Sequence, residues 1–282
     1  MTTAPSPSYQ HLLLTVEDRL AYITMNRPAR RNALSLEHME ELIDAFRTVG
    51  RRGDVGAVVL AGAGPAFCAG HDLSEMSGRS PEFYRQLFDI CTVLMETIQA
   101  IPQPVLAQVH GMATAAGCQL VATCDLVVAA EEARFATPGV KIGLFCTTPM
   151  VALSRAVSAK KAMEMLLTGD PLTAAEAHEI GLVNRVVPAA ELADATRALA
   201  AQIAAASATV VGLGKQAFYR QLGMPQHQAY AYAKEVMSFN ATFADAQEGI
   251  SAFLEKRPPH WGDRSPVRQV WAKTRRSVRT QI

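Results

Sequence analysis

The sequence predicts an α/β fold in which strands and helices alternate, followed by a part that contains helices only. Short apolar runs typical of strands alternate with helical patterns over the first 200 residues. Two of these runs lead into turns of small residues that open a helix. Beyond about residue 200 every pattern is helical. These observations favour an α/β core with a helical C-terminal subdomain.

Size and composition support this prediction. A chain of 282 residues fits one large domain, or a core with an appendage. Its 49 % hydrophobic and 19 % charged residues are typical of a folded protein rather than a disordered one. We divide the chain into a core at 1–200, a helical subdomain at 201–263 and a basic tail at 264–282. The tail is either solvated or packed on a neighbour, or it binds phosphate or an anionic surface.

The elements follow in order from the hydrophobic periodicity. Strand-like runs lie at 12–16, 21–25, 57–61, 105–109 and 126–130. Helical patterns lie at 36–51, 83–100, 151–157, 159–167, 174–180, 191–206, 210–222 and 226–256. Residues 17–19 form a hairpin turn between the first two strands, and Ser35 caps the first helix. Pro102 and Pro104 end the second helix, and we expect a break in the last one near Gly249.

Charge, cysteine usage and the N-terminus suggest a location. The net charge of +1 gives no global case for nucleic acid. The cysteines show no paired spacing and are expected to be reduced; they are Cys68, Cys91, Cys118, Cys124 and Cys146. Residues 1–11 lack the features of a secretory or transit signal, and the longest uncharged stretch, 198–214, is too short to span a membrane. We expect a cytoplasmic protein that binds neither nucleic acid nor membrane.

The two small-residue turns are the candidate site. They lie at 62–73 and 114–125, and each follows an apolar run. Backbone N–H groups at such a turn are unpaired and are backed by the positive end of a helix dipole. Two turns supply two donors to one developing oxyanion. The alternative is that they only connect strands to helices. Gln119, the first polar side chain of the second turn, is not a carboxylate.

Six segments, in order, resemble the crotonase (enoyl-CoA hydratase/isomerase) superfamily over about residues 11–257. They are NRPARRNALS (26–35), FCAGHDL (67–73), HG with AGC (110–111, 116–118), CD (124–125), FATP (135–138) and AEA with GLV (175–177, 181–183). The segments ATAAGCQLVA (113–122), FATPGV (135–140) and GLFC (143–146) are most similar to one vertebrate subgroup of that superfamily.

This resemblance implies a spiral of ββα units with a helical C-terminal trimerisation region. It implies an acyl-CoA thioester as substrate, no further cofactor, no metal, and a homotrimer or dimer of trimers. Two backbone N–H groups, those of His71 and Ala116, would polarise the thioester carbonyl. The resemblance further implies substrate and CoA contacts at Arg30, Arg31, Ala33, Ala69, His71, Asp72, Leu73, Ala116, Phe253 and Lys256.

The chain departs from the family at the two glutamates of a typical hydratase, which would lie at Gln119 and Gly139. The Gln119 amide hydrogen-bonds water but cannot accept its proton at neutral pH. Gly139 offers backbone only. The oxyanion hole is retained, whereas general acid and base groups at the usual places are missing.

Other side chains near the turns leave alternatives open. His71 either faces solvent or assists CoA binding, or it is a catalytic imidazole. We expect Asp72 to cap the following helix, and Glu75 lies on a solvated face or points into the pocket. Cys68, His71 and Asp72 lack a usual metal geometry. Four small polar residues are packing groups or line the acyl site: Cys118, Cys146, Thr147 and Thr148.

Two classes of function follow. The first is an enzyme that stabilises an acyl-CoA enolate, nominally an enoyl-CoA hydratase (a lyase) of fatty acid metabolism. Decarboxylation of a malonyl-type CoA, or thioester hydrolysis, suits a site without a strong base. The second is an acyl-CoA-binding subunit without catalytic activity. For Phe253 and Lys256 the alternative is ordinary helix packing and a solvated lysine.

Overall fold

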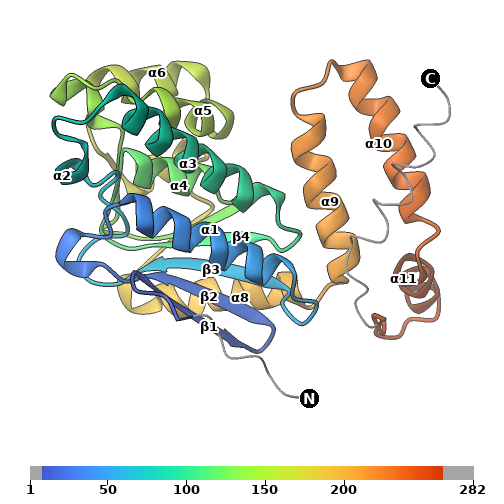
Figure 1. Cartoon of the computed structure of the whole chain (residues 1–282). Coiled ribbons are helices and arrows are strands. Elements are labelled where there is room, and N and C mark those ends of the chain that lie inside the picture. The colour runs from blue at the N-terminus through green and yellow to red at the C-terminus, as the bar shows by residue number, and fades with distance from the viewer. Residues whose placement is uncertain (1–7, 263–282) are drawn as a thin grey trace.

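The computed structural model describes residues 8–262 (Figure 1). Its main sheet has six strands in the order β1-β2-β3-β4-β6-β9. The first pair is antiparallel and the other pairs are parallel. The strands are β1 (Leu12–Glu17), β2 (Leu20–Met25), β3 (Ala57–Gly62), β4 (Val105–Val109), β6 (Leu126–Ala130) and β9 (Arg185–Val187).

The central strands of the main sheet, β3, β4 and β6, are buried on both faces, whereas the edge strand β1 alternates between buried and exposed or half-buried residues. Helices α1 (Leu36–Gly50) and α3 (Pro81–Ala100) cover one face, and α8 (Leu192–Ala204) covers the other (Figure 1). In β3, Val58 and Leu60 belong to the larger core beneath α1 and α3, whereas Val59 packs on the α8 side. Burial of both faces explains why these strands read as continuous apolar runs.

A second, smaller sheet has the order β5-β7-β8, and the periodicity did not reveal it. Its strands are β5 (Met112–Thr114), β7 (Arg134–Ala136) and β8 (Leu172–Thr173). Strands of two or three residues are too short to show an alternating pattern. The remaining core helices are α2 (Leu73–Met76), α4 (Ala116–Thr123), α5 (Thr147–Ala156), α6 (Ala159–Thr168) and α7 (Ala174–Glu179).

The last three helices of the described residues stand beside the core (Figure 1): α9 (Ala208–Gln221), α10 (Gln226–Asn240) and α11 (Ala244–Leu254). The buried ammonium group of Lys215 joins α9 to the core. It pairs with the Asp125 carboxylate at 2.7 Å and donates to the carbonyls of Ile98 and Gln103, each at 2.9 Å. The division into segments ending at 200 and 263 stays a prediction, and the basic tail lies outside the described residues.

Two predicted boundaries are wrong. The break in the last helical stretch falls at residues 241–243, and Gly249 lies inside α11, because a single glycine costs a helix only about 1 kcal/mol. Helix α5 begins at Thr147 rather than at 151, since its first turn is polar and lacks the apolar period. Among the described residues no single helix is long and apolar enough to cross a membrane; the segments 189–204 and 208–221 pass such a test only together and meet at 101°.

Candidate functional site

The two small-residue turns run side by side in register. The segment leading to the first turn pairs in parallel with β5 through a bridge between Cys68 and Ala113. The Cys68 N–H donates to the Met112 carbonyl at 3.1 Å, and the Thr114 N–H donates to the Cys68 carbonyl at 3.0 Å. Three residues beyond each member of this bridge lie His71 and Ala116. The parallel pairing therefore brings these two residues to one place.

Each of the two residues follows a backbone position with positive φ. Gly70 has φ +86°, and Ala115 has φ 51° and ψ −117°. Such a conformation strains alanine by roughly 1–3 kcal/mol. It turns the next amide out of the pairing pattern, and neither the His71 nor the Ala116 N–H finds an acceptor among the described backbone groups. The turns present two adjacent, unpaired donors, and the Ala116 donor opens α4.

Close contact between the turns requires glycine at two places. A β-carbon on Gly70 would lie 2.9 Å from the Ala115 β-carbon and 3.4 Å from the Ala116 nitrogen. A β-carbon on Gly117 would lie 2.2 Å from the Cys68 carbonyl oxygen. Any larger residue at these positions would push the turns, and with them the two donors, apart.

The Asn32 side chain fixes the loop of the first turn by hydrogen bonds, a role that we did not predict from the sequence. Its side chain is fully buried. The amide Nδ2 donates to the carbonyls of Ala63 and Ala66 at 2.9 Å and of Phe67 at 3.1 Å, while Oδ1 accepts from the Arg27 N–H at 2.9 Å. A buried amide with this many bonds fixes the loop that precedes Gly70.

The carboxylates of Asp72 and Glu75 both accept hydrogen bonds at the start of a helix. Asp72 caps α2, as expected, by accepting from the Ser74 N–H at 3.2 Å, and it pairs with Arg27 at 3.1 Å. Burial raises the pKa of Asp72, but the bonds from Ser74 and Arg27 outweigh this effect and hold the pKa below its usual value. The Glu75 carboxylate accepts from the Leu36 N–H at 3.1 Å. The half-exposed Glu75 therefore contributes to capping α1, a role that neither alternative considered for it included.

The His71 side chain is turned inward, so the expectation of a solvent-facing imidazole is wrong. Both ring nitrogens are buried, and no side chain in the described residues hydrogen-bonds them. The ring packs edge-on against Phe88 of α3, with ring centres 5.6 Å apart. Burial lowers the pKa of His71 to about 4, and the Leu34 backbone opposes only part of this effect. The imidazole is neutral at pH 7 because the apolar surroundings disfavour its charged form.

Gln119 lies one turn into α4 and is only 5 % exposed. The Cys91 thiol of α3 donates to its Oε1 atom over 3.8 Å. Burial raises the pKa of the Cys91 thiol to about 12, so this neighbour is a neutral thiol at pH 7. Gln119 therefore presents a neutral amide to this region, and the described structure gives it no charged partner.

Gly139 has no room for a side chain. A β-carbon there would lie 2.0 Å from the Leu144 carbonyl oxygen and 2.8 Å from the Cys146 sulfur. The Leu144 N–H also donates to the Gly139 carbonyl at 3.0 Å, which closes this loop. The space into which a glutamate would extend is occupied by main chain and by a thiol. The backbone around Gly139 therefore leaves no space for a side chain at this position.

The small polar residues considered for the acyl site divide between core and surface. Cys118 and Cys146 are buried, and burial raises the pKa of both thiols, to about 12 for Cys118. Thr147 is exposed and Thr148 half-buried at the start of α5. Cys68 is also fully buried and donates to the Asn32 carbonyl at 3.2 Å, so neutral thiols are expected throughout.

The expected CoA contacts fall into two separate groups. Near the turns, Arg30 and Arg31 are exposed, and the Arg31 carbonyl accepts from the Ala69 N–H at 3.0 Å. Ala33 is 8 % and Leu73 55 % exposed in the same neighbourhood. Phe253 and Lys256 lie instead at α11, on the far side of the molecule (Figure 1). One chain therefore does not bring these two groups together.

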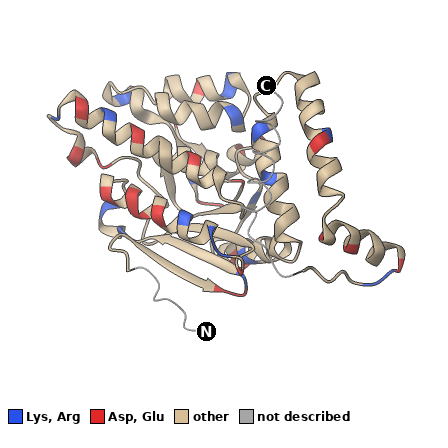
Figure 2. Cartoon of the chain, turned by 45° about the vertical axis from the view of Figure 1, so that its right-hand side comes forward, with Lys and Arg blue, Asp and Glu red and all other residues tan. Residues whose placement is uncertain are grey.

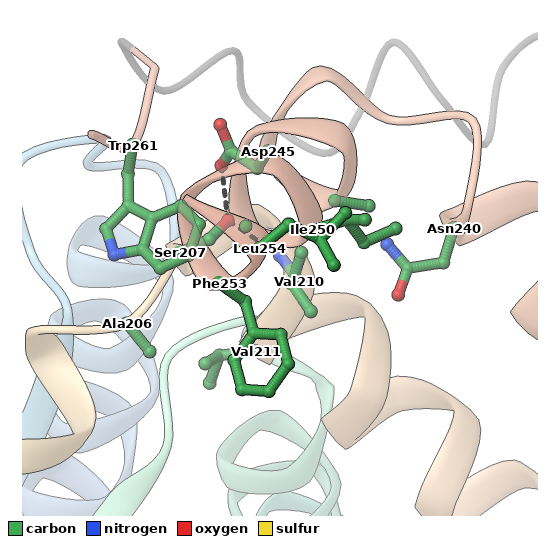
Figure 3. Close-up of a pocket in the computed structure, with 12 residues that line it drawn as sticks. Ala206, Ser207, Val210, Val211, Asn240, Asp245, Ile250, Phe253, Leu254 and Trp261 are labelled. Carbon is green, nitrogen blue, oxygen red and sulfur yellow. Dashed lines mark hydrogen bonds between the residues drawn. The ribbon is translucent and has the colours of Figure 1, made fainter. Parts of the chain in front are cut away.

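Phe253 is 83 % exposed and lines a mostly apolar pocket of about 420 Å³ between α9 and α11 (Figure 3). The Trp261 ring closes one side of this pocket, and the Ser207 hydroxyl donates to Asp245 beside it. The pocket lies among the C-terminal helices and does not include the two turns. Ser207 is paired with Asp245 and the Trp261 ring N–H donates to the Ala205 carbonyl, whereas the buried Asn240 side-chain nitrogen has no partner in the described residues.

Comparison with known proteins identifies the family. The model of the enoyl-CoA hydratase/isomerase family matches residues 15–264. The chain belongs to this family. A crystal structure of an enoyl-CoA hydratase from Mycobacterium smegmatis is 50 % identical, covers 89 % of this chain and 99 % of its own, and superposes with a TM-score of 0.87. The expected crotonase fold is thereby confirmed.

The expected subgroup is also confirmed. Enoyl-CoA hydratase domain-containing protein 3 from rat is 44 % identical over 87 % of this chain and 82 % of its own length. The crystal structure of the human protein of that name is 43 % identical over 89 % of this chain and all of its own, with a TM-score of 0.87. The rat, zebrafish and human members carry "mitochondrial" in their names, and this finding contradicts our expectation of a cytoplasmic protein.

Proposed function

We propose that this member of the enoyl-CoA hydratase/isomerase family processes acyl-CoA thioesters by stabilising an enolate between two backbone amides. The observation that carries the proposal is the pair of donors at His71 and Ala116, three residues beyond a parallel bridge and each preceded by a positive φ. A thioester enolate concentrates negative charge on its oxygen. Two fixed donors favour that state over the neutral thioester, and each is worth about 2.7–4 kcal/mol.

The reaction we favour needs no strong base. Gln119 cannot take a proton from water, Gly139 has no side chain, and the neutral His71 imidazole is too weak a base at pH 7. Decarboxylation of a malonyl-type CoA avoids this difficulty. The electron pair of the breaking C–C bond passes to the thioester as an enolate, carbon dioxide leaves, and solvent supplies the proton. Thioester hydrolysis, with water as the nucleophile, is the other reaction that this set of groups favours over hydration.

We further propose a homotrimer or a dimer of trimers in which Phe253 and Lys256 reach the CoA bound by a neighbouring subunit. Helix α10 has no buried residue, and it carries charge only at Lys234 and Glu235 (Figure 2). Large apolar side chains are exposed on α10 and α11; they include Tyr230 (70 %), Met237 (72 %), Phe253 (83 %) and Leu254 (74 %). Apolar surface of this extent supports an interface between subunits. Analytical ultracentrifugation would show a monomer if this proposal is wrong.

The test of function is a panel of thioesters followed by mass spectrometry: crotonyl-, 3-hydroxybutyryl-, malonyl- and methylmalonyl-CoA, with release of free CoA monitored. Ala116→Pro removes one proposed donor at the first position of α4. A following proline also strains Ala115 at its φ of 51° and ψ of −117°, so the fold of this variant is checked first by circular dichroism. We expect its turnover to fall by about 10²–10³-fold. Ala159→Pro places the same change at the first position of α6 and serves as the matched control. Equal turnover of the two folded variants would exclude the Ala116 donor.

A second candidate function, an acyl-CoA-binding subunit without catalytic activity, is favoured by the backbone that fills the place of the second glutamate at Gly139. It predicts binding of butyryl-CoA by calorimetry with no conversion of any thioester in the panel. Turnover above the uncatalysed rate that competing acetyl-CoA suppresses would exclude it. Efficient hydration of crotonyl-CoA would instead mean that another group replaces both glutamates.

A further inference from the structure

The extended segment that carries His71 lies between two others. On one side, Cys68 pairs with β5 through the bridge described above. On the other side, a second parallel bridge joins His71 to Leu34. There the Leu34 N–H donates to the Gly70 carbonyl at 2.7 Å, and the Asp72 N–H donates to the Leu34 carbonyl at 3.0 Å. Leu34 therefore holds the peptide units on both sides of His71.

This pairing sets the direction of the proposed His71 donor. All described peptide bonds are trans, and in a trans unit the carbonyl and the N–H that follows it point in opposite directions. Because the Gly70 carbonyl faces Leu34, the His71 N–H points to the other side, on which β5 and the second turn lie. A shift of Leu34 relative to Gly70 would rotate this peptide unit and turn the donor away.

The Arg27 guanidinium connects the two paired segments. Its Nη1 donates to the Ala33 carbonyl, and its Nη2 lies 3.1 Å from a carboxylate oxygen of Asp72. Ala33 and Asp72 are the chain neighbours of the two bridged residues. Only 15 % of the Arg27 and 8 % of the Asp72 side chain is exposed, so solvent competes little for these bonds. Because a guanidinium presents its donors in a fixed planar fork, the two bonds fix the spacing of the segments next to the proposed donor.

Arg27 differs from the two arginines that follow it along the chain. Arg30 and Arg31 are exposed, as a contact with CoA would require. The Arg27 guanidinium is instead paired within the chain. Burial raises the pKa of its partner Asp72, but the bonds from Ser74 and Arg27 lower it by more, so this carboxylate is charged at pH 7. Arg27 is therefore placed to hold the first turn rather than to contact a substrate.

We propose that Arg27 is a positioning residue, whose guanidinium holds the Leu34 and His71 segments together so that the His71 N–H stays directed at the thioester oxygen. This inference rests on the proposed oxyanion hole, in which that N–H is one of two donors. A preorganised donor stabilises charge only while its direction is fixed. Loss of the guanidinium should therefore weaken the polarisation of a bound thioester more than it weakens binding.

The experiment measures the thioester carbonyl stretch of bound butyryl-CoA, labelled with a heavy carbon isotope, by infrared difference spectroscopy. A carbonyl that accepts two fixed hydrogen bonds absorbs at a lower frequency than it does in buffer, and this readout needs no turnover. We expect native protein to lower the frequency and Arg27→Met to lose most of this shift. For any thioester of the panel that is turned over, kcat of Arg27→Met should fall by about 10–10²-fold, while KM stays within about twofold.

Three further variants separate positioning from a loss of stability, each checked for folding by circular dichroism. Asp72→Asn keeps an oxygen to cap α2 but places an amide nitrogen opposite the guanidinium, and should lose part of the shift. Arg27→Lys keeps the charge but reaches only one of the two partners, and should retain part of the shift. The control Arg52→Met removes a pair with Asp54 at the opposite end of β3 from the first turn, and should keep the full shift.

The inference is overturned if folded Arg27→Met keeps the native shift, or if Arg52→Met loses as much of it as Arg27→Met does. If Arg27→Met does not fold, a full native shift in both Asp72→Asn and Arg27→Lys overturns it instead. A different result tests the proposed function itself. Native protein that binds butyryl-CoA without lowering the carbonyl frequency, or that does not bind it, would exclude the oxyanion hole on which this inference rests.

Discussion

Replacing Gly139 by alanine tests whether the backbone excludes a side chain at the place of the second glutamate. The new β-carbon would lie 2.0 Å from the Leu144 carbonyl oxygen, whereas real β-carbons essentially never approach a heavy atom within 3.0 Å. The carbonyl must therefore retreat by at least 1.0 Å, the difference between these two distances. The Cys146 sulfur, at 2.8 Å, blocks part of the available space.

The magnitude follows from two costs. Overpacking of a close-packed site costs about 1–3 kcal/mol, and the shift weakens the 3.0 Å bond between the Leu144 N–H and the Gly139 carbonyl, worth about 0.5–1.5 kcal/mol. We expect Gly139→Ala to lower the free energy of unfolding by about 2–4 kcal/mol, measured by urea titration at fixed protein concentration. A glutamate at 139 would meet the same clash, so Gln119→Glu with Gly139→Glu should not create an efficient hydratase.

Gly214 provides the matched control for this prediction. It lies on the exposed side of α9, and a β-carbon there would have no neighbour within 4 Å. Gly214→Ala should raise the free energy of unfolding by up to about 1 kcal/mol, because alanine favours the helix. If Gly139→Ala were as stable as the native protein while Gly214→Ala behaved as expected, the argument from Leu144 would be refuted.

Three further changes test the site and its support. Gln119→Glu alone should give little crotonyl-CoA hydration, because Gly139 still supplies no second carboxylate; substantial hydration in a spectrophotometric assay would reveal another acid or base. Asn32→Leu should lower the free energy of unfolding, measured in urea, by about 2–4 kcal/mol, because it leaves several carbonyls and one N–H unpaired. The control Asn184→Leu removes a single bond to the Val127 N–H and should lower it by about 1 kcal/mol. His38→Phe should reduce the loss of unfolding free energy that the native protein shows as the pH falls. Burial lowers the pKa of His38 from 6.5 to about 4, so its contribution is present above pH 6.5 and is lost as pH falls toward 4, by roughly 3 kcal/mol in total. The free energy of unfolding is measured by urea titration at several pH values between 4 and 6.5. This reasoning is contradicted if that free energy changes with pH equally in the native protein and in His38→Phe.

Much of the fold could be predicted because the central strands are buried on both faces and read as apolar runs. The run at 57–61 and the one at 126–130 became β3 and β6 almost unchanged. The short strands β5 and β7 escaped prediction because three residues are too few to show an alternating pattern. The break near Gly249 was placed by the presence of a glycine, whereas the chain actually turns at 241–243.

For the candidate site, local composition predicted the turns but not the direction of their side chains. Small residues at 69–70 and 115–117 pointed to close backbone contact, and the absence of a carboxylate at Gln119 is visible in the sequence alone. The inward orientation of His71 depends on Phe88, which belongs to a helix after the turn. The obstruction at Gly139 depends on the carbonyl of Leu144, and no side-chain pattern records a main-chain atom.

The register between Cys68 and Ala113 has a consequence for how this site is encoded. Both proposed donors are main-chain groups, reached by stepping three residues from that bridge. The proposed oxyanion hole is thus specified by the number of residues in two short segments rather than by the side-chain chemistry at 71 and 116. Many single substitutions in these segments would leave both donors in position. Deletion of a single residue from either segment would displace one donor. Evolution can therefore exchange the chemistry around such a hole while the hole itself is inherited.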